Sequence, residues 1–277
     1  MKINKDSLSM KAKSIAKEKG ISINVVYSRY FFDCFLKRLS FSPYSEKFVL
    51  KGGLFLSSML GIENRSTMDI DFILRKIHMD HDSVIDIMKE ICQESADDNV
   101  IFQYMGDSEI KKDDIYGGFS VSIEGRLENV KQRFDIDLAT ADTVYPKDCD
   151  YEYQCLITGE TIHLKTYSVE SVIAEKMQTF LLKGILNSRT KDLYDIYVLE
   201  RFVKKNDESL KEAFRETCQN RRFEIDRENA MKILKSIESN VTQKKRWETY
   251  AKKMSFARNV SFDEVIVSIK HLLEVML

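Results

Sequence analysis

The sequence has few of the residues that interrupt or cross-link a chain. Only two of its 277 residues are proline, which excludes proline-rich spacers, and no repeat or low-complexity segment is present. The five cysteines are scattered, odd in number and not spaced as metal ligands, which argues against a disulfide framework. We therefore expect reduced thiols, as in a cytosolic protein.

Long apolar runs and a strong charge of either sign are also missing. No stretch is apolar enough to span a membrane, and the first residues lack the apolar core of a signal peptide. The formal net charge is −1, so any nucleic-acid contact must come from a local basic patch. With 43% hydrophobic residues, the composition is that of a globular, cytoplasmic protein with a sizeable core and no membrane contact.

Apolar periodicity divides the chain near residue 165. Helical spacing occurs in the first forty residues and around 81–94, and after Ser168 it continues to Leu277. Strand-like stretches lie near 48–50, 68–74, 99–104, 116–126, 131–140 and, as a shorter pair, 154–165. We predict an α/β (α+β) domain with a small mixed sheet over residues 1–165 and an all-helical domain over residues 166–277. The active-site cleft is expected between them.

The first candidate motif is a glycine pair followed by two aspartates. Gly52 and Gly53, after Lys51, stand between a predicted strand and a short helix, whose first amides could hold phosphate oxygens. Asp69 and Asp71 are two apart on a strand, so both project from one face, while Met68, Ile70, Phe72 and Leu74 are expected on the other. Taken alone, the glycine pair could simply form a turn, and the two aspartates could simply lie on a solvent-exposed strand edge.

A third carboxylate comes from a later strand with the same alternation. Asp135 and Asp137 point one way, and Phe134, Ile136 and Leu138 point the other. Three carboxylates can hold two Mg²⁺ ions that activate an attacking hydroxyl and screen a leaving pyrophosphate. We predict Asp69, Asp71 and Asp137 as metal ligands, with Asp135 as the alternative for the third.

A second candidate motif opens the helical part. Ser168 is a predicted N-cap, and Lys176 falls on the apolar stripe of the helix that follows. On the next predicted helix, Asp195 lies among core residues and is placed to pair with Lys176, as Asp192 could also do. A lysine that extends to solvent, or a buried ion pair that only fixes helix packing, would explain the same pattern.

Together these segments resemble a known family. Gly52–Gly53 followed by Arg65–Asp71 resembles the glycine-pair and Asp-x-Asp signature of DNA polymerase β-like nucleotidyltransferases. The Arg-x-Ser/Thr-x-Asp-hydrophobic-Asp form, with Tyr167–Lys176 and Lys191–Tyr197, is similar to the AbiEii toxins of bacterial abortive-infection and toxin–antitoxin systems. Leu54 departs from the pattern, because a small hydroxyl residue usually follows the glycine pair.

The resemblance implies a Mg²⁺-dependent transfer of a nucleotide from a nucleoside triphosphate to RNA, with the acceptor end of tRNA as the candidate target and a cognate antitoxin as partner. It assigns Lys176 to the phosphates, and Asp192 and Asp195 to orienting that lysine or the acceptor. Nucleotide binding would involve Lys51, Gly52, Gly53, Arg65, Thr67 and Lys176. Two alternatives remain open: a small-molecule or protein acceptor, and a non-catalytic nucleotide-binding module.

The last part of the sequence is rich in basic residues. Cations occur at Arg221, Arg222, Arg227, Lys244, Lys245, Arg246, Lys252, Lys253 and Arg258. Trp247, Tyr250 and Phe256 are interleaved with them, which is typical of a nucleic-acid surface. Acidic residues such as Glu224 and Glu248 dilute the charge, so a solvated amphipathic bundle explains the same residues.

Overall fold

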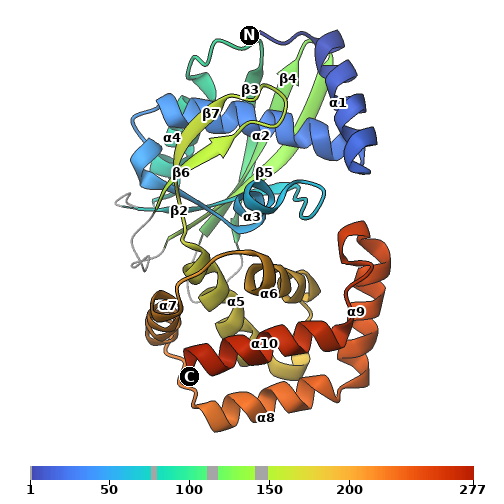
Figure 1. Ribbon diagram of the computed structural model, residues 1–277. Coiled ribbons are helices and arrows are strands. Elements are labelled where there is room, and N and C mark those ends of the chain that lie inside the picture. Colours follow the sequence, from blue (N-terminus) through green and yellow to red (C-terminus); the bar gives the residue numbers. More distant parts are fainter. Residues whose placement is uncertain (1, 76–79, 111–117, 141–148) are drawn as a thin grey trace. The chain divides into compact units, whose positions relative to one another are not determined.

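Seven strands in the first part of the chain form one mixed sheet (Figure 1). The computed structural model describes residues 2–75, 80–110, 118–140 and 149–277. The described residues fall into two units, and the chain passes from the first to the second between Thr166 and Tyr167.

The first unit contains the sheet and the helices that flank it. Its elements are α1 (Lys5–Lys19), α2 (Ile23–Phe41), η1 (Ser45–Lys47), β1 (Phe48–Lys51), α3 (Gly52–Leu60), β2 (Asp69–Leu74), α4 (His81–Gln93), β3 (Ile101–Ile110), β4 (Gly118–Leu127), β5 (Val130–Thr140), β6 (Cys149–Gln154) and β7 (Thr161–Thr166). The strand order is β3-β4-β5-β2-β1-β7-β6. β2 is parallel to β5 and β1 is parallel to β7, while the other neighbours are antiparallel. The predicted mixed sheet is confirmed.

Two details of the sequence prediction are wrong. The last strand pair was expected over 154–165, but β6 ends at Gln154, and residues 155–160 form a connection closed by a 2.9 Å bond from the Cys155 amide to the Glu160 carbonyl. The apolar Cys155 and Ile157 mimic a strand, yet their side chains fill the core from this connection. Met68, expected on the apolar face of β2, precedes the strand and is 44% exposed.

The alternation of β5 separates an apolar face from an acidic one. Phe134, Ile136 and Leu138 are buried. The Phe134 ring lies edge-on to two rings of α2, 5.0 Å from Phe32 and 6.3 Å from Phe35 between centroids. Helix α2 therefore covers one face of the sheet, and the aspartates between the apolar residues project from the opposite face.

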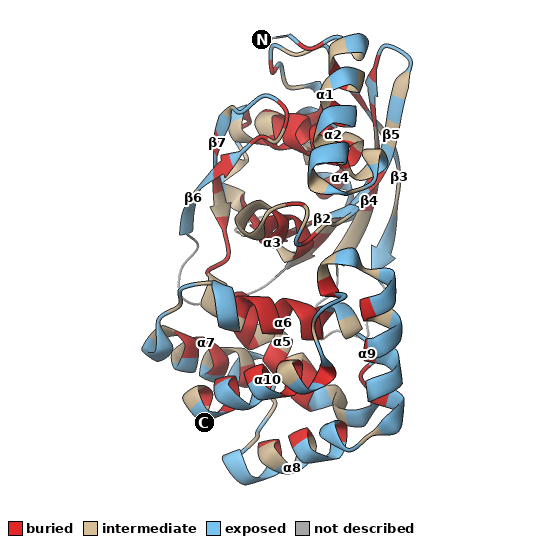
Figure 2. Ribbon diagram, turned by 45° about the vertical axis from the view of Figure 1, so that its right-hand side comes forward, coloured by how far each residue is buried: buried red, intermediate tan, exposed pale blue. Residues whose placement is uncertain are grey.

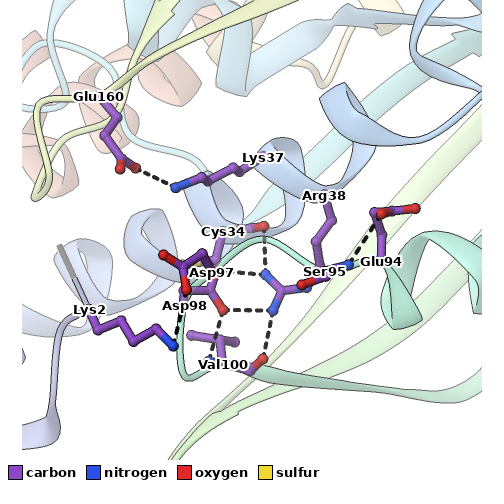
Figure 3. Close-up of polar contacts among 10 residues, drawn as sticks. All are labelled: Lys2, Cys34, Lys37, Arg38, Glu94, Ser95, Asp97, Asp98, Val100 and Glu160. Atoms are coloured by element: carbon purple, nitrogen blue, oxygen red, sulfur yellow. Dashed lines mark hydrogen bonds and ion pairs between the residues drawn. The ribbon is translucent and has the colours of Figure 1, made fainter.

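A buried arginine connects α2 to the residues just before β3 (Figure 3). The Arg38 guanidinium donates to both carboxylate oxygens of Asp98, at 2.8 and 2.7 Å, and to the Val100 carbonyl at 2.7 Å. Bidentate pairing satisfies a charge that would be costly to bury alone. This contact anchors α2, the helix that packs on the apolar face of the sheet, opposite the aspartates.

The second unit is helical, as predicted. Its elements are α5 (Val169–Lys183), η2 (Gly184–Leu186), α6 (Thr190–Phe202), α7 (Asp207–Asn220), α8 (Arg227–Glu238), α9 (Val241–Lys253), η3 (Ser255–Ala257) and α10 (Phe262–Met276). The predicted N-cap is confirmed, because the Ser168 hydroxyl accepts a 3.0 Å bond from the Ser171 amide. Helices α5 and α6 are largely buried (Figure 2).

The described part of the chain contains no helix with the length and hydrophobicity to cross a membrane. All five cysteines are free thiols, in agreement with the sequence prediction.

Candidate functional site

Strand register brings the four predicted carboxylate positions together. In the parallel pair of β2 and β5, Asp69 is opposite Asp135, and Asp71 is opposite Asp137. Because residues two apart share a face, all four aspartates project from the side of the sheet that α2 leaves uncovered. Two aspartate pairs on adjacent strands thus form one acidic surface.

The glycine pair lies directly against this surface. Gly52 has a φ of +65°, a conformation that side chains rarely tolerate, and a Cβ there would overlap the Asp71 carboxylate and lie 2.9 Å from its Cβ. The Gly53 amide donates to Asp71 Oδ2 at 3.3 Å. The two glycines therefore do more than turn the chain: they let the N-terminus of α3 approach an acidic side chain closely.

Residues just before β2, Arg65 and Thr67, pack against the glycine turn at Gly53. A Cβ at Gly53 would lie 2.7 Å from Thr67 Oγ1 and 3.4 Å from an Arg65 nitrogen. Arg65 is 6% exposed, and its Nη1 donates to the Ser66 carbonyl at 2.5 Å. Thr67 and Arg65 thus support the glycine turn, and their predicted contact with a nucleotide stays a prediction.

Lys51 lies beside the acidic surface, whereas Leu54 lies in the core. Lys51 is the N-cap residue of α3 and pairs in register with Asp71, so it lies beside the acidic surface. Leu54, which replaces the expected hydroxyl residue, is 1% exposed. Its side chain belongs to the core, so this substitution adds apolar packing to α3.

Two serines that sequence reasoning missed hold the β5 carboxylates. Ser120 on β4 is opposite Asp137 and donates to its Oδ1 at 2.6 Å, and Ser122 is opposite Asp135 and donates to its Oδ1. The sequence does contain a signal, because hydroxyl residues two apart on one strand share a face, as the aspartates do. Recognising it requires knowledge that β4 and β5 are neighbours.

The acidic surface fits a hard divalent cation in chemistry and in backbone placement. Carboxylate oxygens are the ligands that Mg²⁺ prefers, and Asp69, Asp71 and Asp137 present them from one face. Over residues 2–75, 80–110, 118–140 and 149–277, no three Asp, Glu, His or Cys side chains converge as a metal-binding group. Rotation of the aspartate side chains would therefore have to accompany the binding of an ion.

The second predicted constellation forms within the helical unit. Lys176 Nζ on α5 lies 2.6 Å from Asp192 Oδ1 and 2.9 Å from Asp195 Oδ2, both on α6. Arg189 Nε also pairs with Asp192. The predicted pairing across the two helices is confirmed, and the side chains of both aspartates are almost inaccessible, at 5% and 0%.

The charges of this cluster stabilise one another. Burial alone would lower the pKa of Lys176, but attraction by Asp195 and Asp192 outweighs it and raises that pKa above its ordinary value. Burial would raise the pKa of Asp192, but Lys176 and Arg189 lower it to about 2. Lys176 is thus a firmly protonated ammonium held in a fixed direction.

Among the aromatic residues of the basic C-terminal stretch, Trp247 belongs to the core, while Tyr250 and Phe256 are half-buried. Trp247 is 1% exposed and its Nε1 donates to the Val260 carbonyl at 3.0 Å. The Phe256 ring lies 4.8 Å from the Tyr194 ring between centroids. The Trp247 ring is therefore not available for stacking on nucleic-acid bases, because it fills the space beneath α9.

The comparisons with known proteins identify a family and a shared fold. Residues 34–267 match a family described as "Nucleotidyl transferase AbiEii toxin, Type IV TA system". A crystal structure of a presumed nucleotidyltransferase from H. pylori is similar with a TM-score of 0.53 and 14% identity, over 92% of this chain and 96% of that one. The crystal structure of JHP933 from Helicobacter pylori is similar with a TM-score of 0.52 and 14% identity, over 92% of both chains. At this identity the two structures show a shared fold. No curated protein matches the sequence.

Proposed function

Because the chain belongs to the AbiEii family of nucleotidyltransferase toxins, we propose that it transfers a nucleoside monophosphate from a nucleoside triphosphate to RNA, with the 3′ end of tRNA as acceptor. The reaction takes place in the cytoplasm and depends on Mg²⁺. The observation that carries the proposal is the register of β2 and β5, which sets Asp69 and Asp71 beside Asp135 and Asp137.

The reaction breaks a phosphoanhydride bond of the triphosphate and forms a phosphodiester bond to the RNA. The 3′ hydroxyl oxygen of the RNA bonds to the α-phosphorus, the bond from that phosphorus to the β-phosphate oxygen breaks, and pyrophosphate leaves. The Asp137 carboxylate takes the hydroxyl proton. Two Mg²⁺ ions, held by Asp69, Asp71 and Asp137, would supply charge neutralisation at the attacking and leaving oxygens.

The glycine turn has two roles in this proposal. The Gly53 amide holds the Asp71 carboxylate in place, and the close approach at Gly52 brings the α3 N-terminus to the acidic surface. A helix N-terminus is a favourable place for phosphate oxygens, because its amides point outward and its dipole is positive there. The triphosphate would therefore lie along the start of α3.

Lys176 contributes a phosphate contact in the proposal. Its support is chemical: Asp192 and Asp195 keep the ammonium charged and oriented. The same contacts would also serve a purely structural role. Lys176→Arg keeps the charge and moves the donor, so a phosphate contact predicts a raised KM for the triphosphate, whereas a structural role predicts an unchanged KM.

Asp137 is preferred to Asp135 as the third carboxylate. It is opposite Asp71, the residue that the Gly53 amide holds, and it is half-buried where Asp135 is exposed. Asp137→Asn should therefore abolish transfer, while Asp135→Asn should retain a measurable rate. The opposite ranking would assign the third role to Asp135.

The experiment that tests the function incubates the purified protein with Mg²⁺, total tRNA and each α-labelled nucleoside triphosphate. Asp69→Ala/Asp71→Ala is the test variant, and Asp82→Ala/Asp86→Ala, two exposed aspartates of α4, is the matched control. Label on tRNA with wild type and control, but not with the test variant, supports the proposal. Label on a protein or on a small molecule would show that the acceptor is not RNA. Nucleotide binding without any transfer would indicate a non-catalytic module.

The family description also supports a regulatory partner. Toxins of a Type IV toxin–antitoxin system are restrained by a co-encoded antitoxin, and we infer such a partner and a role in abortive infection for this chain. Expression of the wild type should arrest growth, and the neighbouring gene should relieve the arrest. Arrest by the Asp69→Ala/Asp71→Ala variant would separate toxicity from transfer.

A further inference from the structure

Helix α9 faces the core with one narrow side. Gln243, Trp247 and Ala251 are buried at a spacing of four residues. Gln243 Nε2 also donates to the carbonyls of Ile185 and Asn187, at 2.6 and 2.9 Å, which fixes the start of the helix. The other sides of α9 are therefore held in a defined orientation toward solvent, and Figure 2 shows the helix mostly pale blue.

The solvent-facing sides of α9 and the following η3 are strongly basic. Between residues 241 and 258 the sequence has six cations and one acid, Glu248, although the whole chain has a net charge of −1. All six cations are exposed, among them Lys244, Lys245, Lys252, Lys253 and Arg258. We call these five residues the α9 basic surface. The sixth, Arg246, donates to the Asn187 carbonyl at 3.0 Å and serves the fold.

These cations have no acidic partners in the described part of the chain. No ion pair within 4.0 Å involves any member of the α9 basic surface, even though Glu248 stands four residues from both Lys244 and Lys252. Some exposed cations of the same unit are paired with acids: Lys232 lies 2.6 Å from Glu228 on α8, and Arg215 pairs with Glu212 on α7. What distinguishes α9 and η3 is the density of this charge, with six cations and one acid between residues 241 and 258.

We propose that the α9 basic surface binds the phosphate backbone of RNA. The inference rests on the proposed function in that RNA is the acceptor, and it names the part of the chain that holds this substrate. Lys245 and Lys252 are seven residues apart, two turns or about 10.5 Å along the helix, so they can contact separate phosphates of one strand. Because Trp247 is buried, the contact acts through charge and carries no base preference.

The surface chemistry favours RNA over a protein or a membrane. A protein interface needs apolar anchors at its centre, and all five members of the α9 basic surface are cationic. A membrane-bound helix inserts its apolar side, but the apolar side of α9 is occupied by the core of its own unit. Exposed cations without acidic partners are the arrangement that phosphate contacts require.

The test compares two quadruple variants of the full chain that remove the same charge. Lys244→Gln/Lys245→Gln/Lys252→Gln/Lys253→Gln alters the α9 basic surface. Lys211→Gln/Lys232→Gln/Lys235→Gln/Lys270→Gln alters exposed lysines of α7, α8 and α10 and is the matched control. Binding of fluorescein-labelled tRNA is measured by anisotropy at several salt concentrations, after thermal unfolding has shown that both variants fold.

The surface variant should weaken binding at least about tenfold near physiological salt and lower the slope of log Kd against log salt by about 3, since four phosphate contacts are lost. The control should keep the wild-type slope. A wild-type slope in the surface variant, or an equal loss of tRNA affinity in both variants, would overturn the proposal. A surface variant that no longer binds an antitoxin protein but still binds RNA like the wild type would also overturn it.

Transfer assays distinguish this inference from the proposed function. If the wild type binds tRNA through the α9 basic surface but labels no RNA, the surface stands and the proposed reaction fails. If the wild type labels tRNA and the surface variant has an unchanged KM for tRNA, the reaction stands and the surface is refuted. Nucleotide binding in Mg²⁺ without RNA should be equal in all three proteins.

Discussion

Gly52→Ala is the substitution whose effect the structure predicts most directly. Position 52 combines a φ of +65° with a Cβ direction that runs into Asp71. An added Cβ would overlap the carboxylate and lie 2.9 Å from the Asp71 Cβ, where ordinary contact begins at 3.4 Å. The carboxylate can rotate, but both Cβ atoms are fixed to their backbones, so β2 or the glycine turn must move.

Gly20→Ala is the matched control. Gly20 ends α1 with a φ of +62°, and an added Cβ there meets nothing within 4 Å. The control therefore measures the backbone cost alone, about 1–2 kcal/mol. Gly52→Ala carries the same cost and adds overpacking of about 1–3 kcal/mol. In urea unfolding, Gly52→Ala should reduce the free energy of unfolding by about 2–5 kcal/mol.

Activity should separate the two alanine variants further. A shift of about 1 Å in a reacting group can reduce a rate on the order of 100-fold. Transfer of α-labelled nucleotide to tRNA should therefore fall about 100-fold or more for Gly52→Ala and stay near wild type for Gly20→Ala. Equal stability and equal activity of the two variants would refute the close packing of Gly52 against Asp71 as a requirement of the site.

Three further outcomes are expected. Lys176→Met leaves two buried carboxylates without their shared cation, so the free energy of unfolding in urea should fall by about 3–5 kcal/mol, and a loss below about 1 kcal/mol would contradict the buried cluster. The pKa of Asp192 falls from 3.8 to about 2 on folding, so its carboxylate contributes about 2 kcal/mol to stability above pH 4, and this contribution is lost as the pH falls toward 2. When the free energy of unfolding is measured from pH 5 to pH 2, the Asp192→Asn variant should lack this pH-dependent loss. Identical pH profiles of wild type and variant would refute the contribution. Ser120→Ala removes the donor that orients Asp137 and should lower the transfer rate about tenfold with stability nearly unchanged, whereas Ser122→Ala should have a smaller effect; a larger effect of Ser122→Ala would point to Asp135 as the third carboxylate.

Local patterns in the sequence were sufficient for much of the site. Alternation on a strand determines that Asp69 and Asp71 share a face, whatever the rest of the chain does. Helical spacing likewise placed Lys176 and Asp195 on the facing sides of two helices, and the structure pairs them at 2.9 Å. Patterns of this kind depend on bonds within one element, so they can be read without a fold.

Contacts between distant segments were decided by the tertiary structure alone. The pairing of Asp71 with Asp137 depends on the parallel register of β2 and β5, which are separated by three other elements along the chain. A register shift of one residue would turn the β5 aspartates toward the core and expose Phe134, Ile136 and Leu138. The burial of these three side chains, with Phe134 packed against α2, opposes such a shift.

The same limit explains why the sequence left the role of Trp247 open and gave no role to Ser120. Trp247 among cations has the composition of a nucleic-acid surface, but its ring is buried because α9 packs on neighbouring helices of the second unit. Ser120 is unremarkable on its own strand and becomes part of the site because β4 lies next to β5. The sequence by itself determined which groups each strand and helix presents; the tertiary structure decided which of them meet, because burial and strand pairing are properties of the whole chain.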